Sequence, residues 1–134
     1  MEEISGIMKK EHARLYSLFF VIKEKIKQNS EDIKELIQEF IWELDKHFFL
    51  EEKLIFSIYS NLGNIDVLDL IKEHKDILWK VNRIYEIRDE IQDLDKLLLK
   101  HSDSEDKNFY PFIDKSIDNE NKKIILSRLN EIIE

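Results

Sequence analysis

Six side chains in this sequence have the types and the spacing expected of a site for borderline metal ions. They comprise four imidazoles and two carboxylates and include every histidine of the chain: His12, His47, Glu51, His74, His101 and Glu105. Two of the histidines are each followed four residues later by one of the glutamates, so in a helix each pair lies one turn apart on one face. Nitrogen and oxygen ligands of this kind suit iron, manganese or zinc, whereas magnesium and calcium prefer all-oxygen shells.

These residues occupy positions where a helix is expected to be apolar. Over residues 33–58, apolar side chains recur at alternating steps of four and three, which is typical of the buried stripe of a bundle helix. His47 and Glu51 take two places in that stripe, and the other four residues lie on similar stripes. A buried polar group without a partner costs about 1 to 3 kcal/mol, so something in the core must satisfy them.

The composition indicates an all-α chain. Its 134 residues contain only two glycines and one proline, so it lacks the turn residues that a sheet protein needs. We expect one domain over residues 1–134, an up-down-up-down four-helix bundle followed by a short C-terminal fifth helical segment. Ser5 is the expected N-cap of the first helix, which should end near Lys27, and Pro111 should kink or stop the fourth. The second helix should be capped by Asn29 or Ser30 and end near residues 60–61. The third should start after Asn64, with a turn at residues 88–90 between it and the fourth. The fifth segment should start after residues 118–119.

The turns predict that the six polar residues meet. In an antiparallel pair of helices, residues equally distant from the shared turn lie at the same height. His12 lies 17 residues before Asn29 and His47 lies 18 after it, and the counts across the other two turns also differ by one residue, which is about 1.5 Å of helix rise. We expect one metal ion between His12 and His47, a second between His74 and His101, and both glutamates spanning the two ions.

Charge and composition exclude several other classes of site. The net charge of −8 is spread along the chain, which argues against nucleic acid and anionic membranes as partners. No stretch has the length and hydrophobicity of a signal peptide or membrane span, so a cytoplasmic location is expected. The absence of cysteine excludes disulfides, iron–sulfur clusters, thiolate zinc sites and thiol catalysis.

Other polar and aromatic residues near the six have less specific interpretations. We expect the tyrosines and tryptophans to pack at helix boundaries and not to relay electrons; they are Tyr16, Tyr59, Tyr85, Tyr110, Trp42 and Trp79. Four acidic residues directly flank the predicted ligands and are expected to be solvated or to orient imidazoles; they are Glu11, Glu52, Glu73 and Asp106.

The sequence resembles the hemerythrin-like family of HHE cation-binding domains. The matching motifs are KEH at 10–12, HFFLEE at 47–52, KEH at 72–74 and HSDSEDKNFYP at 101–111. The resemblance implies a non-haem di-iron centre in a four-helix bundle. Leu78 stands where oxygen-carrying hemerythrins have a further histidine, so the ligand set is more similar to the four-His, two-Glu version of repair-of-iron-centres proteins and of iron- and oxygen-sensing members.

The expected function is therefore binding of dioxygen or nitric oxide at two iron ions, for sensing, scavenging or storage. Manganese or zinc could replace iron in such a ligand set. One alternative is an enzyme or iron-centre repair protein that turns over peroxide or nitric oxide, and another is an iron-dependent sensor or interaction module. The ligand would contact apolar walls, which we expect to be Leu15, Phe40, Leu44, Phe48 and Ile77.

Overall fold

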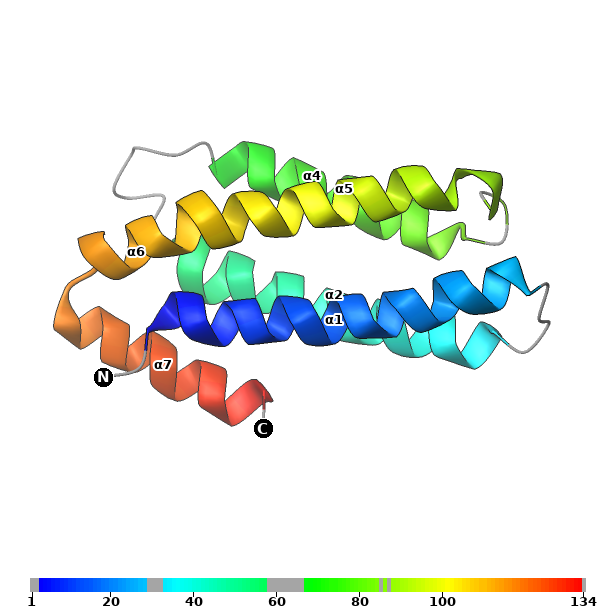
Figure 1. Cartoon of the computed structure of the whole chain (residues 1–134). Coiled ribbons are helices and arrows are strands. Elements are labelled where there is room, and N and C mark those ends of the chain that lie inside the picture. Colours follow the sequence, from blue (N-terminus) through cyan, green and yellow to red (C-terminus); the bar gives the residue numbers. More distant parts are fainter. Residues whose placement is uncertain (1–2, 29–32, 58–66, 85, 87, 134) are drawn as a thin grey trace.

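Four long helical segments lie side by side in this computed structural model, which describes residues 3–28, 33–57, 67–84, 86 and 88–133 (Figure 1). The first segment is α1 (Ile4–Lys27), and the second is α2 (Lys34–Leu50) continued by the π-helix η1 (Glu51–Phe56). The third is α4 (Val67–Asn82). The short 3-10 helix η2 (Arg88–Glu90) leads into the fourth, which consists of α5 (Ile91–Ser104), the π-helix η3 (Glu105–Phe109) and α6 (Tyr110–Ser116). The expected all-α bundle is confirmed.

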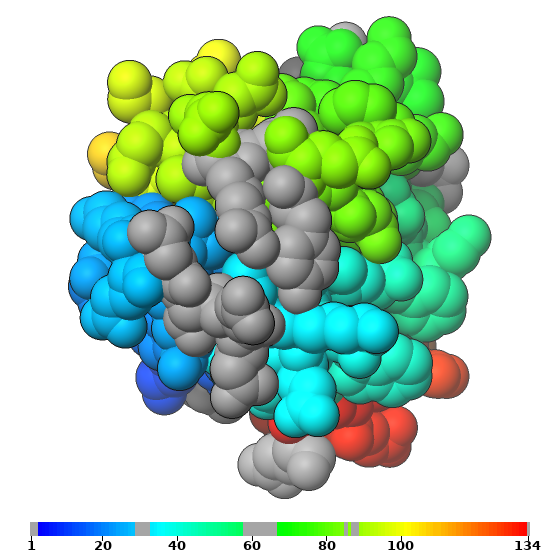
Figure 2. All heavy atoms as spheres, turned by 90° about the vertical axis from the view of Figure 1, so that its right-hand side faces the viewer, coloured from blue at the N-terminus to red at the C-terminus, as the bar shows by residue number. Residues whose placement is uncertain are grey.

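The four segments surround one interior in the order of the chain. Viewed from the end where α1 finishes and α2 begins, they occupy the four corners of the molecule (Figure 2). Helix α1 packs against α2, α2 against α4 and α4 against α5, and the circuit closes where α1 meets η3 and α6. Each helix therefore has the next helix of the chain as a neighbour, as an up-down-up-down topology requires.

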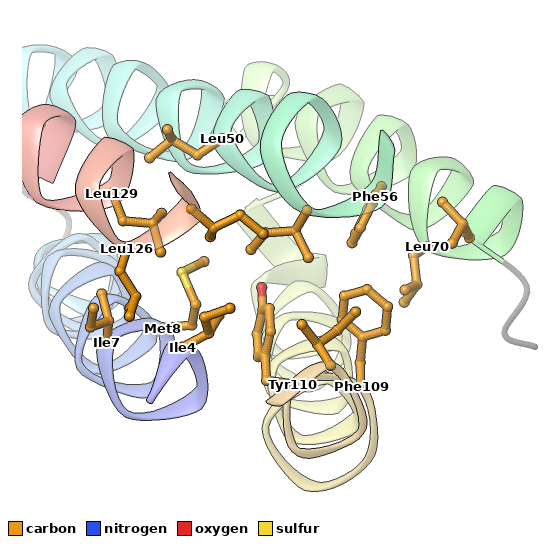
Figure 3. Close-up of a cluster of buried hydrophobic side chains, with 14 residues drawn as sticks. Ile4, Ile7, Met8, Leu50, Phe56, Leu70, Phe109, Tyr110, Leu126 and Leu129 are labelled. Atoms are coloured by element: carbon orange, nitrogen blue, oxygen red, sulfur yellow. The ribbon is translucent and has the colours of Figure 1, made fainter. Parts of the chain in front are cut away.

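The apolar interior is divided into two clusters along the bundle. One cluster includes Leu15, Phe19, Phe40 and Val81, and it extends to Ile22 and Ile33 near the end of α1 and the start of α2. The other gathers side chains from the opposite end, including Met8, Leu50, Phe56 and Phe109 (Figure 3). His12, His74, His101 and Glu105 each fall in sequence between residues of one cluster and residues of the other, whereas His47 and Glu51 flank the change from one cluster to the other at Phe48 and Leu50.

The fifth segment covers one end of the bundle. Helix α7 (Asn119–Ile133) buries Ile125, Leu126 and Leu129 in the cluster of Figure 3, which also contains Ile4 from the start of α1. The Lys122 ammonium adds a polar link, because it donates a hydrogen bond to the Glu3 carboxylate at 2.7 Å. This contact surface accounts for the amphipathic pattern of residues 119–133.

The cap of α1 differs from the sequence prediction. The helix begins at Ile4, so Ser5 lies inside it, and Glu3 at the N-cap makes no side-chain cap. Instead, the Asp114 carboxylate on α6 accepts hydrogen bonds from the backbone N–H groups of Ile4 at 2.9 Å and Ser5 at 3.0 Å. The expectation for Ser5 was wrong because the cap comes from a residue more than a hundred positions away.

Two further boundaries differ from expectation. Pro111 does not stop the fourth segment, which continues to Ser116 with the proline in the first turn of α6, directly after the π turn η3. Helix α4 ends at Asn82, earlier than the predicted turn at 88–90, and the Asn82 side chain donates to the Leu78 carbonyl at 2.7 Å. The predictions for Asn29, Ser30, residues 60–61 and Asn64 lie outside the described residues.

Within the described ranges, no helix combines the length and hydrophobicity needed to span a lipid bilayer.

Replacing Asp114 with alanine should destabilise the protein by about 1 kcal/mol, because two N–H groups at the start of α1 lose their acceptor. Chemical denaturation of the purified variant measures this change. Asp103→Ala, at an exposed position on α5, is the control and should change the unfolding free energy by less than about 0.5 kcal/mol. Equal effects of the two variants would contradict the assigned cap.

Candidate metal centre

The six predicted ligands converge on one buried layer. Glu51 and Glu105 are completely inaccessible to solvent, and all four histidines are buried. The rings of His12 and His47 have centroids 5.0 Å apart, and those of His74 and His101 have centroids 4.8 Å apart. The structure thus brings the histidines together in the two pairs that the sequence predicts.

Each glutamate reaches one histidine from each pair. Glu51 Oε1 lies 2.8 Å from His47 Nε2 and 3.5 Å from His74 Nε2. Glu105 Oε1 lies 3.2 Å from both His12 Nε2 and His101 Nε2. As a result, two groups of four residues can each place their ligand atoms within 4.8 Å of one another, and both groups contain both glutamates.

Seven buried side-chain atoms of this layer lack hydrogen-bond partners among the described residues. These buried atoms are Nε2 of all four histidines, Nδ1 of His47, and Oε1 of both glutamates. Buried polar atoms in folded proteins are normally satisfied. Six of the seven are the atoms that would face shared cations, so the residues present fit a pair of metal ions.

The helical backbone changes its hydrogen-bond pattern at both glutamates. Each glutamate is the first residue of a π-helical turn, in η1 and in η3. The residues four and five positions later are buried in both turns, Ile55 and Phe56 in one and Phe109 and Tyr110 in the other. Single π turns are frequent at functional sites, and the heptad pattern used for the sequence prediction gives no signal for them.

Three of the histidines are held on their outer side by carboxylates that flank the ligands. Asp106 accepts from His12 Nδ1 at 2.9 Å, and Glu73 accepts from His101 Nδ1 at 2.6 Å. Glu52 accepts from His74 Nδ1 at 3.3 Å. A carboxylate can only accept, so Nδ1 carries the proton and Nε2 is left for a metal ion. Three of the four flanking acids thus orient imidazoles, as the sequence allowed.

Tyr110 is part of the site, although we expected it to be a packing residue. Its hydroxyl donates a hydrogen bond to Glu51 Oε2 and lies 3.5 Å from Glu105 Oε2. Figure 3 shows the ring rising from its helix with the hydroxyl oxygen directed into the bundle interior. The phenol therefore binds the carboxylate oxygens that face away from the histidines. Tyr110 lies within the motif at 101–111, but the apolar spacing did not indicate that its hydroxyl enters the layer, since its position follows the π turn η3.

A family model described as the hemerythrin HHE cation binding domain matches residues 3–113. The chain belongs to this family. No curated protein and no solved structure matches the chain. Membership of a cation-binding family, together with the buried cluster of histidines and glutamates, indicates that this hemerythrin-family protein binds metal.

Two phenylalanines enclose one histidine of this hemerythrin-family site. The His74 ring stacks on Phe48 with centroids 3.8 Å apart and an interplanar angle of 9°. The rings of Phe56 and His74 have centroids 5.6 Å apart and an interplanar angle of 18°. Since Phe48 and Phe56 belong to different apolar clusters, His74 joins the two clusters through its ring faces.

A small cavity of about 30 Å³ adjoins the layer. Four of the five predicted wall residues line it, and Ile77 is buried in the core without doing so. The remaining lining is His12, His47, His101, Tyr16, Phe19, Leu98 and Ser102. Tyr16 is thus a wall residue as well as a packing residue. The exposed Trp42 and Trp79 lie on the outer surface.

Burial and charge set different protonation states for the histidines of the metal-free protein. Burial alone lowers the pKa of His12, but the hydrogen bond to Asp106 and the nearby Glu105 carboxylate outweigh it and raise the pKa to about 10. Burial also acts to lower the pKa of His101, but the hydrogen bond and negative charge of Glu105 outweigh burial and raise this pKa to about 9. Burial dominates at His74 and lowers its pKa to about 3.

The pKa values of the two glutamates are shifted in opposite directions. Burial and the neighbouring Glu105 carboxylate raise the pKa of Glu51 above its usual value. Burial also acts to raise the pKa of Glu105, but its contacts with Glu51, His101 and His12 outweigh burial and lower that pKa well below the usual range. The metal-free layer therefore holds its negative charge on Glu105, between imidazolium groups.

In the metal-free protein, the charged forms of His12 and His101 should stabilise the fold in a pH-dependent way. Both pKa values are raised from 6.5, so this contribution is full below pH 6.5, declines above it and is lost above about pH 10. Denaturation in the presence of a chelator, at pH values below 6.5, near 8 and above 10, measures it. The advantage of wild type over a His12→Gln, His101→Gln variant should shrink as pH rises, and a constant difference would contradict the assignment.

Proposed function

We propose that this protein binds two iron ions in the polar layer and uses them to bind dioxygen or nitric oxide for sensing, scavenging or storage. His12 and His47 would hold one ion, and His74 and His101 the other. Glu51 and Glu105 would bridge the two. The observation that carries this proposal is the position of each glutamate oxygen, which lies against one histidine of each pair.

The donor set supports iron as the metal. Four imidazole nitrogens and two carboxylates suit iron, and they also accept manganese or zinc. Bound iron would supply the electrons that dioxygen binding requires. The protein contributes outer carboxylates that fix the imidazole rings, and the Tyr110 hydroxyl that fixes the Glu51 carboxylate.

The shape of the adjoining cavity supports a small ligand. Its volume of about 30 Å³ exceeds the roughly 10–15 Å³ that one water molecule needs, and its walls are mainly Leu and Phe side chains. Such a space admits a diatomic molecule and disfavours charged or larger ligands. The apolar walls also limit the access of water and protons to the ligand.

Protein purified without added metal, then loaded anaerobically with ferrous iron, should contain two metal ions per chain by elemental analysis. The Glu51→Ala, Glu105→Ala double variant should retain close to none, because both ions lose both bridging ligands. Asp103→Ala, whose side chain is exposed on α5, serves as the control and should keep two. One ion per wild-type chain would refute the two-ion centre.

Anaerobic reduction followed by exposure to air should produce a visible charge-transfer absorption band, since dioxygen would bind to the reduced centre. The double variant is the control and should remain colourless. No spectral change in the wild type would exclude dioxygen as the ligand. Many turnovers of peroxide or nitric oxide under steady reductant would instead favour the enzymatic alternative.

A further inference from the structure

The outer carboxylates follow a rule around the bundle, with one exception. An acidic residue beside a ligand on one helical segment accepts a hydrogen bond from the histidine of the next segment. This holds from η1 to α4, from α4 to α5, and from η3 back to α1. The three contacts are Glu52 with His74, Glu73 with His101, and Asp106 with His12.

The missing contact is the one from α1 to α2. By the rule, Glu11 should accept from His47, because Lys10-Glu11-His12 repeats Lys72-Glu73-His74 and Glu73 holds the histidine of the following helix. Yet His47 Nδ1 is buried and makes no hydrogen bond within the described residues. The layer therefore has one unsupported imidazole.

The Glu11 carboxylate is instead bound by Arg14. Arg14 Nη2 donates a hydrogen bond to Glu11 at 2.9 Å, and Nε donates a second one to Glu11 at 3.4 Å. Nη2 also donates to Glu43 on α2 at 2.9 Å. Glu43 lies one helical turn before His47 on α2, so Arg14 holds Glu11 at the α1–α2 contact. Glu11 is buried despite its charge, which fits a carboxylate fixed by a forked cation.

The two predicted metal positions are unequal as a result. The pair His74 and His101 has a carboxylate on each ring, and His74 is also stacked between two phenylalanines. The pair His12 and His47 has one supporting carboxylate, Asp106. An outer carboxylate fixes the ring and makes its nitrogen more basic, and losing one typically lowers metal affinity 10- to 100-fold.

We propose that Arg14 is a positioning residue that makes the His12/His47 position the weaker of the two metal positions, by withholding Glu11 from His47. This inference rests on the proposed two-ion centre. The weaker ion is the one that dissociates first, so the single arginine sets which half of the centre exchanges metal with its surroundings. Removing the guanidinium frees Glu11 to accept from His47 and makes the two halves alike.

Zinc titration of the metal-free 134-residue chain, in competition with a chromophoric chelator, tests this inference without redox chemistry. The wild type should bind two zinc ions with dissociation constants that differ at least tenfold. Arg14→Gln should tighten the weaker step about tenfold or more and leave the tighter one unchanged. Glu73→Gln should weaken the tighter step, which assigns that step to His74 and His101. Arg83→Gln, at a similarly exposed arginine, is the matched control and should change neither.

NMR of the zinc-loaded protein supplies a readout that a merely structural role of Arg14 would not move. Imidazole N–H protons that are hydrogen-bonded to carboxylates resonate at low field. The wild type should show three, Arg14→Gln four, and the Glu11→Gln, Arg14→Gln double variant three again. Two ions bound with equal affinity, or three signals in Arg14→Gln, would overturn the inference while leaving the two-ion centre intact. Binding of fewer than two zinc ions by the wild type would refute the centre itself, and this inference with it.

Discussion

The structure depends on one electrostatic constraint, the burial of four imidazoles and two carboxylates across the middle of an apolar bundle. Each helical segment contributes to this layer, and every contribution replaces an apolar side chain. Isolated charges at such positions would be strongly unfavourable. The protein arranges them as a network in which outer carboxylates accept hydrogen bonds from the imidazoles and the Tyr110 hydroxyl donates a hydrogen bond to Glu51. The inner atoms of this network are thereby left facing one another.

The bundle and the layer could be predicted because both follow from spacing. Apolar residues at steps of three and four specify which helix faces turn inward, and polar residues on those faces must then meet. His12 and His47, far apart in sequence, were placed at one height by counting residues from a turn. The pairing of His74 with His101 followed in the same way, and the structure has both pairs.

Other features depend on long-range contacts or on departures from the α-helical repeat. Tyr110 reaches Glu51 only because the π turn η3 changes which residues face inward. The cap of α1 comes from Asp114, a pairing that no local pattern contains. Likewise, the sequence placed Glu11 beside a ligand without revealing that Arg14 holds it. These features require the relative positions of helices that only coordinates supply.

The division of the apolar interior has a consequence for cooperativity. The polar layer separates two hydrophobic cores, one of which includes α7 and the start of α1, while the other includes the end of α1 and the start of α2. The His74 ring links the two cores by stacking on Phe48 of one and Phe56 of the other. The backbone of α1 also connects the two cores, because this helix runs without a break from one to the other. Metal ions held by residues from all four segments would join the two cores into a single unfolding unit.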